Sequence, residues 1–289
     1  MSANSKPPAP TTINAWLDDA TTQFDRANIP SARLDAELLL CHMLGVDRTW
    51  LIAHGDDSLA RAALSQKGGT RREGLKDYGE RLILRRLKRE PIAYLIGRKD
   101  FYGREFSVTS DVLIPRPETE VMIELLTLPA EKAKTLIDIG TGSGAIAVTA
   151  KLTFPHLKVE AVDISEEALK VAKKNAKNFG AVVRFYSSNL LEKAGSSYDV
   201  ICANLPYVSR NWQVSPDVHA EPDLALYADD DGLALIKQLI QQASTRQETG
   251  SHLLLEADPR QHDEIIMHGN KYGYGWYQTE GFIVVLEKK

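Results

Sequence analysis

The first part of the chain contains three segments in which apolar side chains recur at intervals of three and four positions. This spacing places the apolar side chains on one face of a helix. Ser31 stands before the second segment as a candidate N-cap, and Gly45 follows it as a stop signal. Residues 12–92 are therefore predicted to form a small helical bundle with a loop at 66–70. The three helical segments are 12–24, 31–44 and 78–90.

Apolar and polar residues alternate between Gly97 and Ile114, with turn residues at Gly103 and at Ser110-Asp111. Alternation with a period of two is typical of β-strands. The segment therefore predicts a β-hairpin that joins the helical bundle to the rest of the chain.

From about Pro115 onward, strand patterns and helix patterns follow one another repeatedly. Such alternation predicts parallel strands connected by crossover helices, which is an α/β fold. Two last strand-like runs, 273–277 and 282–287, predict a hairpin that adds one antiparallel strand. The other predicted strands are 135–139, 158–162, 182–186, 198–203 and 251–256, and the predicted helices are 145–153, 166–179, 232–243 and 260–270.

Composition narrows the class of protein. A chain of 289 residues that is 43% hydrophobic can bury one large core or two unequal ones. It has no apolar run near the roughly 20 residues of a membrane span, and its Pro-rich start lacks the apolar centre of a signal peptide. A cytoplasmic protein without membrane contact is predicted. Cys41 and Cys202 lie far apart in apolar stretches, which predicts free buried thiols and no metal site.

The net charge of −4 conceals a basic segment. Residues 61–104 hold 13 Lys or Arg against 5 Asp or Glu, a local charge of +8, so the remainder carries −12. One interpretation is a solvated helix face. The other is a docking surface for an acidic protein or for RNA.

The most informative motif is the tetrad Asn204-Leu205-Pro206-Tyr207, which directly follows the predicted strand 198–203. Ligands of open α/β sheets bind at the carboxyl ends of the strands. There the Asn204 side-chain oxygen and the Leu205 main-chain oxygen can each accept one N–H of a planar NH2 group, while Tyr207 covers its plane. The tetrad predicts a planar amide or aromatic amine as substrate.

A glycine-rich string, from Asp138 to Ala145, ends the first predicted strand of the sheet. Glycines at such a turn let a ligand approach the backbone and the amides at the helix start. The string fits a dinucleotide site and an S-adenosylmethionine site equally. Asp163 follows about 20 residues later, where a carboxylate can bind ribose hydroxyls. The plain alternatives are a tight turn and an N-cap for the helix that follows.

The tetrad favours S-adenosylmethionine over a dinucleotide as the cofactor. It offers no His or Lys for hydride transfer, whereas a methyl group on a sulfonium is already activated and needs mainly alignment with its acceptor. Asn204 and the Leu205 carbonyl would stabilise the positive charge that develops on the NH2 group. Methyl transfer is therefore favoured, and the sequence identifies no general base for it.

Several strings together resemble the PrmC/HemK family, whose members methylate the glutamine side-chain amide in the Gly-Gly-Gln motif of peptide-chain release factors. The resemblance covers nearly the whole chain, and the string that starts at Leu113 is its most specific part. It implies a Rossmann-like, seven-stranded methyltransferase domain that uses S-adenosylmethionine and releases S-adenosylhomocysteine. The strings are Leu113-Ile-Pro-Arg-Pro-Glu-Thr-Glu120, Asp138-Ile-Gly-Thr-Gly-Ser-Gly-Ala145, Ala161-Val-Asp-Ile-Ser165, Asn204-Leu-Pro-Tyr207 and Glu221-Pro-Asp-Leu-Ala-Leu226.

The resemblance also implies roles for individual residues. The methyl donor would be bound by Gly140, Thr141, Gly142, Ser143, Gly144, Asp163, Asn189, Leu190 and Asn204. The glutamine amide would be held by Asn204, Leu205, Pro206 and Tyr207, with Arg116, Pro117, Glu118 and Thr119 in the same cleft. Because Pro115 and Pro117 restrict the backbone, a rigid linker is the alternative for that last segment.

The same resemblance predicts a domain plan and partners. Residues 1–95 would be a helical domain that recognises the release factor, 96–119 a hairpin and linker, and 120–289 the methyltransferase domain. The basic segment would contact the release factor, the ribosome or RNA. A single chain with its own recognition domain is expected to be a monomer.

Two positions depart from the family pattern. Leu205 stands where the family usually has proline, although its main-chain carbonyl is retained, and Ser188-Asn189 replaces a common Gly-Asp. Asn-Leu-Pro-Tyr also occurs in ribosomal RNA adenine dimethyltransferases, so methylation of an adenine amine in RNA or DNA is the alternative function. A net negative charge argues against nucleic acid. A catalytically silent binding module is a third hypothesis.

Overall fold

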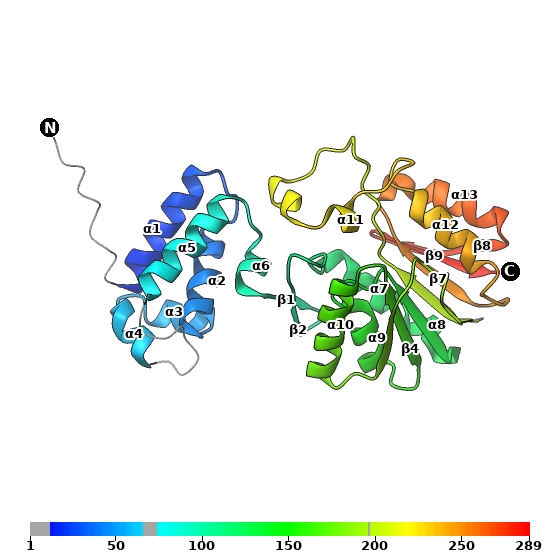
Figure 1. Ribbon diagram of the computed structural model, residues 1–289, viewed down its shortest axis with the longest axis horizontal. Helices are drawn as coiled ribbons and strands as arrows, with labels where there is room; N and C mark the ends of the chain where they lie inside the picture. The colour runs from blue at the N-terminus through cyan, green and yellow to red at the C-terminus, as the bar shows by residue number, and fades with distance from the viewer. Residues whose placement is uncertain (1–11, 66–73, 196) are drawn as a thin grey trace. The chain divides into compact units, whose positions relative to one another are not determined.

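The computed structural model describes residues 12–65, 74–195 and 197–289, so the loop predicted at 66–70 lies outside the described residues. The chain divides into two compact units, Met1–Ile96 and Gly97–Lys289 (Figure 1). In the described part, no helix is long and apolar enough to cross a membrane.

The N-terminal unit is a bundle of helices around its own apolar core. Thr12 caps the first helix by accepting a hydrogen bond from the Ala15 amide at 3.2 Å. Gly45 ends the second in the left-handed conformation, with φ of 70°. The three predicted helices are confirmed, and three shorter ones were not predicted because five to seven residues show too little periodicity. The helices are α1 (Ile13–Arg26), α2 (Ala32–Leu44), α3 (Arg48–Ala53), α4 (Leu59–Ser65), α5 (Leu75–Leu87) and α6 (Ile92–Ile96).

Part of the basic segment is used inside this unit. Arg86 is buried and pairs with Asp35 at 2.7 Å, and Arg85 pairs with Glu90. Arg89 donates to the carbonyl of Ala27 at 2.6 Å. These cations stabilise the fold, so the +8 charge of the sequence overstates the charge offered to a partner.

The C-terminal unit is built on a seven-stranded sheet with the order β5-β4-β3-β6-β7-β9-β8 (Figure 1). The pairs within β3 to β7 are parallel, and β9 is antiparallel to both of its neighbours. The predicted α/β class and the single antiparallel strand are thus confirmed. The strands are β3 (Thr135–Ile139), β4 (Lys158–Asp163), β5 (Val183–Ser187), β6 (Val200–Ala203), β7 (His252–Glu256), β8 (Tyr274–Glu280) and β9 (Ile283–Lys288).

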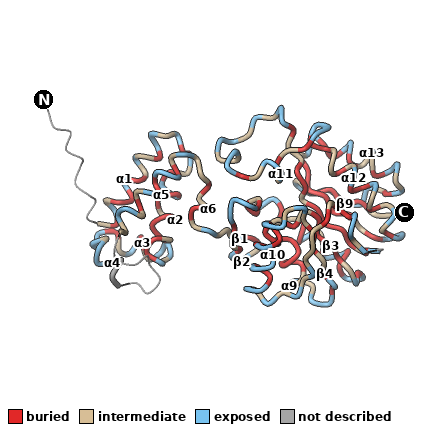
Figure 2. Tube along the Cα trace, viewed as in Figure 1, coloured by how far each residue is buried: buried red, intermediate tan, exposed pale blue. Residues whose placement is uncertain are grey.

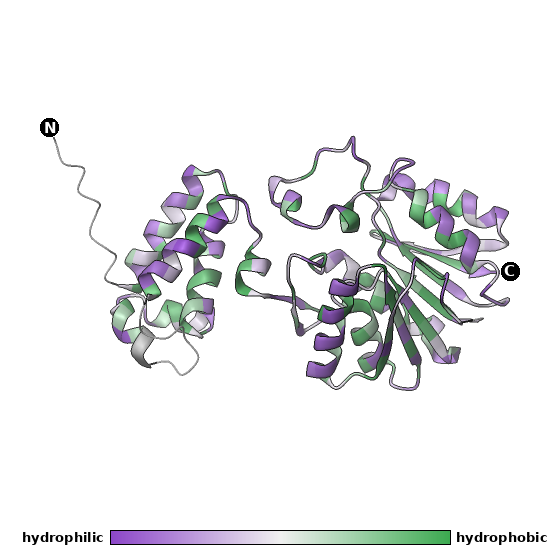
Figure 3. Ribbon diagram, viewed as in Figure 1, coloured by the Kyte–Doolittle hydropathy of each residue, from purple (hydrophilic) through white to green (hydrophobic). Residues whose placement is uncertain are grey.

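The middle of the sheet is buried on both faces (Figure 2), as its apolar strands require (Figure 3), whereas the edge strands β5 and β8 are mostly half-buried or exposed. Neighbouring residues of β3 point to opposite faces of the sheet: Leu136 packs in one apolar cluster and Ile137 in the other. The helices of this unit are α7 (Glu120–Leu125), α8 (Thr127–Lys132), α9 (Ala145–Thr153), α10 (Glu166–Phe179), α11 (Asp223–Leu226), α12 (Ala234–Ala243) and α13 (His262–Lys271), with 3-10 turns η1 (Pro117–Thr119), η2 (Pro216–Ala220) and η3 (Pro259–Gln261).

The hairpin of β1 (Arg98–Phe101) and β2 (Arg104–Ser107) is shorter than the alternating segment. It packs within the C-terminal unit: Phe106 meets Phe179 of α10 with ring centroids 5.0 Å apart. The Ser107 amide donates to the Asn175 side chain at 2.9 Å. These contacts make the hairpin an integral layer of this unit.

Candidate active site

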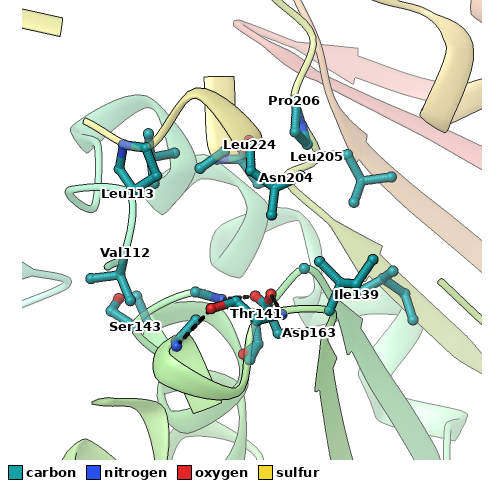
Figure 4. A pocket seen from close by; sticks show the side chains of 18 of the residues that line it. Val112, Leu113, Ile139, Thr141, Ser143, Asp163, Asn204, Leu205, Pro206 and Leu224 are labelled. Carbon is teal, nitrogen blue, oxygen red and sulfur yellow. Dashed lines mark hydrogen bonds between the residues drawn. The ribbon is translucent and has the colours of Figure 1, made fainter. Parts of the chain in front are cut away.

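A cavity of about 380 Å³ lies at the carboxyl ends of the parallel strands in the C-terminal unit (Figure 4). This is the edge at which α/β sheets bind ligands. Its walls come from the loops after β3, β4, β5 and β6, and from two further segments around 110–119 and 222–225.

The glycine turn after β3 forms the floor of the cavity. Gly142 has φ of 53°, and a Cβ at this position would meet nothing within 4 Å. Gly144 has φ of 81°, and its Cβ would lie 3.2 Å from the Ala172 backbone in α10. The positive φ favours glycine at both positions, and at Gly144 close packing against α10 also leaves no room for a side chain.

Asp138 stabilises the glycine turn through two hydrogen bonds. Its side chain is fully buried, and Oδ2 accepts from the Thr141 hydroxyl at 2.6 Å and from the Ala147 amide at 3.2 Å. Burial raises the pKa of Asp138 to about 7. The sequence interpretation assigned it no role, although it opens the glycine string.

Asp163 ends β4 and faces the cavity (Figure 4). Its two oxygens accept from the amides of Gly142 and Ser165, each at 2.9 Å, so the carboxylate is fixed against the glycine turn. Burial raises its pKa. The N-cap of α10 is Ser165, which accepts from the Ala168 amide at 3.1 Å. The alternative of Asp163 as a plain N-cap is therefore not what the structure shows.

Asn189 and Leu190 line the cavity after β5. The Asn189 side-chain amide donates to Glu192 at 2.7 Å, and Leu190 is buried in a left-handed conformation with φ of 48°. Both residues thus border the same space as Asp163.

Only part of the tetrad lines the cavity, and Tyr207 is half-buried outside the lining. Asn204, Leu205 and Pro206 line the cavity (Figure 4), and Asn204 follows β6 beside Gly140, because Ile139 pairs with Ala203 on the neighbouring strand. The Asn204 side-chain NH2 donates to the Thr119 hydroxyl oxygen at 3.1 Å. Tyr207 lies behind them, and its hydroxyl donates to Glu256 Oε1 at 3.2 Å.

Only some residues of the segment before α7 line the cavity. Arg116 and Thr119 line the cavity, whereas Glu118 is exposed and lies outside its lining. Arg116 pairs with the buried Glu221, whose other oxygen accepts from the Ile114 amide at 3.1 Å. Glu221 therefore connects the segment around 110–119 to the segment that begins at 222. The sequence did not predict this role.

Comparison with known proteins decides the family. The family described as "Methyltransferase small domain" matches residues 117–221, and "PrmC N-terminal domain" matches residues 15–67. Release factor glutamine methyltransferases of Bordetella pertussis and Koribacter versatilis are 39% and 38% identical. The alignments cover 89% of this chain and 86% of the first relative, and 86% of this chain and 89% of the second. The chain belongs to the release factor glutamine methyltransferase family.

Membership of this family confirms the resemblance inferred from the sequence motifs, and the adenine-methyltransferase alternative is not favoured. A third relative, from Deinococcus radiodurans, is 34% identical over 84% of this chain and 85% of its own length. A methyltransferase structure from Pyrococcus furiosus has a TM-score of 0.50 at 20% identity, covering 65% of this chain and 89% of that one. That likeness concerns the fold alone.

Proposed function

We propose that this protein transfers a methyl group from S-adenosylmethionine to the side-chain amide nitrogen of the glutamine in the Gly-Gly-Gln motif of a peptide-chain release factor. One observation carries the proposal. Asn204 and Leu205 line the same cavity as the glycine turn and Asp163, so that a donor bound along the turn and a planar amide held at the tetrad would meet.

The donor side fits S-adenosylmethionine. Gly142 leaves its side of the cavity open, and Asp163 presents a fixed carboxylate to ribose hydroxyls. Asn189 offers a polar side chain to the adenine edge, and Leu190 an apolar surface. The bound sulfonium supplies an activated methyl group, and S-adenosylhomocysteine is the product.

The acceptor side fits an amide NH2 group. The amide nitrogen is a poor nucleophile because its lone pair is shared with the carbonyl. The Asn204 Oδ1 and the Leu205 carbonyl oxygen would each accept one N–H, which stabilises the positive charge that develops on nitrogen as the new bond forms. Leucine supplies this carbonyl as well as proline does.

The N-terminal unit is the candidate for recognition of the release factor. Its match to the PrmC N-terminal domain supports this role. Because Arg85, Arg86 and Arg89 are engaged inside the unit, we infer that the surface recognises protein rather than RNA. A substrate that acts in translation would place the enzyme in the cytoplasm.

The function is tested with radiolabelled S-adenosylmethionine. Purified protein is incubated separately with a release factor, with the same factor carrying Gln→Ala in its Gly-Gly-Gln motif, and with ribosomal RNA. We expect label on the intact release factor alone. Label on RNA, or on the Gln→Ala factor, would contradict the proposal.

Asp163→Asn is expected to weaken S-adenosylmethionine binding about 30-fold, which corresponds to roughly 2 kcal/mol for charge-assisted hydrogen bonds. At saturating donor, kcat should change little, because Asp163 lies on the donor wall. Isothermal titration calorimetry and the KM for S-adenosylmethionine measure the effect.

Asp199→Asn is the matched control. Asp199 also accepts two backbone amides, from Lys134 at 2.7 Å and Thr135 at 2.9 Å, but it lies outside the cavity lining. Its replacement should leave the donor affinity unchanged. An equal loss of affinity in both variants would show that Asp163 acts only through stability.

A further inference from the structure

Glu256 is a buried carboxylate behind the tetrad. It ends β7, and only 1% of its surface is exposed. Because β6 and β7 are parallel and pair Ala203 with Leu255, Asn204 and Glu256 follow at the same level of the sheet. Glu256 does not belong to the cavity lining, so it would act through its neighbours.

Three side chains of the site approach this carboxylate. The Tyr207 hydroxyl donates to Oε1 at 3.2 Å. Thr119 and Asn204 also direct hydrogen-bonding groups at it, while Oε2 completes no hydrogen bond to a described residue. Burial raises the pKa of Glu256 to about 7, although the contacts from Thr119, Tyr207 and Asn204 act in the opposite direction. A buried carboxylate with an unsatisfied oxygen is costly, and such groups gather at functional sites.

The hydrogen-bond directions give Glu256 its role. The Thr119 hydroxyl oxygen accepts from the Asn204 NH2 group, so the hydroxyl proton of Thr119 is left to donate elsewhere. An ionised carboxylate only accepts, and it therefore favours this arrangement. With its NH2 group committed to Thr119, the Asn204 amide has Oδ1 left to accept from a substrate in the cavity.

We propose that Glu256 is a positioning residue: its ionised carboxylate, which accepts from Tyr207, acts through Thr119 to hold the Asn204 amide with Oδ1 toward the substrate NH2 group. The inference rests on the proposed function, because it explains how the acceptor site is oriented. In the neutral acid, Glu256 could donate to Thr119, and the constraint on Asn204 would be lost.

The main test is Glu256→Gln, which keeps the size of the side chain but adds donors. We expect kcat on the release factor to fall about 10- to 100-fold through misalignment, with both KM values within about twofold of wild type. Thr119→Val removes the middle of the chain and should give a similar loss. The double variant should lose no more kcat than either single variant, because each of the three proteins breaks the same connection from Glu256 through Thr119 to Asn204.

A pH profile separates positioning from general packing. The wild-type kcat should fall as the pH drops through about 7, and the Glu256 contribution to that fall should be missing in Glu256→Gln. Burial also raises the pKa of Asp138 to about 7, and Asp138 should contribute equally to the profiles of both proteins. Among described residues, the charge of Glu118 also raises the pKa of Glu256, the charge of Arg116 lowers the pKa of Tyr207, and the β9 partner of Glu256 is the apolar Ile283.

Glu160→Gln is the matched control. Glu160 also accepts from tyrosine hydroxyls, those of Tyr186 at 2.8 Å and Tyr198 at 2.9 Å, but it lies outside the cavity lining. Its kcat should equal that of wild type. Wild-type kcat in Glu256→Gln, or additive losses in the double variant, would overturn the proposal.

A measurement that does not depend on turnover tests the positioning role of Glu256 separately from the methylation of the release factor. The side-chain NH2 resonance of Asn204, assigned by its loss in Asn204→Asp, should shift and exchange faster in both Glu256→Gln and Thr119→Val. An unshifted resonance would overturn the positioning role. If wild-type protein labels no release factor, the proposed function fails, and the resonance still decides the role of Glu256. If Glu256→Gln does not fold, Thr119→Val and its resonance decide it.

Discussion

Asn204→Ala is expected to lower kcat on the release factor by about 100- to 1,000-fold. The substitution removes one of the two oxygens that would accept from the substrate NH2 group, and the loss of one preorganised charge-stabilising contact typically has this effect. Because Asp163 and Gly142, which would hold the donor, lie in the loops after β4 and β3 and keep their hydrogen bond to each other, binding of S-adenosylmethionine should weaken much less. Steady-state kinetics and calorimetric donor affinity together measure the contrast.

The matched control is Asn178→Ala, an exposed position on α10, which should retain wild-type kcat. A fall in donor affinity as large as the fall in kcat would place Asn204 in donor binding instead. Wild-type kcat in Asn204→Ala would remove the amide-holding role from the tetrad and with it the main argument for a planar amine as substrate.

Sequence reasoning worked best where local signals decide the structure. Helix α10 has the bounds that the sequence predicts, and the structure shows a local signal at each end: Ser165 caps its start, and Gly180 ends it in a left-handed conformation. The central strands β3, β6 and β7 were predicted because strands buried on both faces are mostly apolar. The short helices α7 and α8 were not, since six residues show less than two turns of periodicity.

In the candidate site, too, the sequence predicts what depends on local signals and misses what depends on distant contacts. Residues that follow strands, such as Asp163 and Asn204, could be placed at one edge from topology alone. The parts played by Glu221 and Glu256 depend on contacts with residues far away in sequence, Ile114 and Tyr207. No local pattern reports such contacts. The position of the Tyr207 hydroxyl on Glu256 likewise emerges only from the packed structure.

Gly232→Ala is expected to be strongly destabilising and to displace the tetrad. Gly232 has φ of 87°, and a Cβ there would lie 1.9 Å from the Tyr207 carbonyl oxygen and 2.6 Å from Gln261 Nε2. That nitrogen donates to the same carbonyl at 2.9 Å, which fixes the backbone at the end of the tetrad. The clash is with backbone, so it cannot be relieved by turning a flexible side chain. We expect a loss above about 3 kcal/mol and a lower kcat.

Gly250→Ala isolates the conformational part of this effect. Gly250 has the same φ of 87°, but a Cβ there would meet nothing within 4 Å. The left-handed backbone alone should cost about 1 to 2 kcal/mol. Since 1 kcal/mol shifts the melting temperature of a domain this size by about 2–4 °C, Gly232→Ala should melt several degrees below Gly250→Ala. Equal melting temperatures, with wild-type kcat in both, would mean that the loop before α12 yields to the methyl group and does not hold Tyr207 in place.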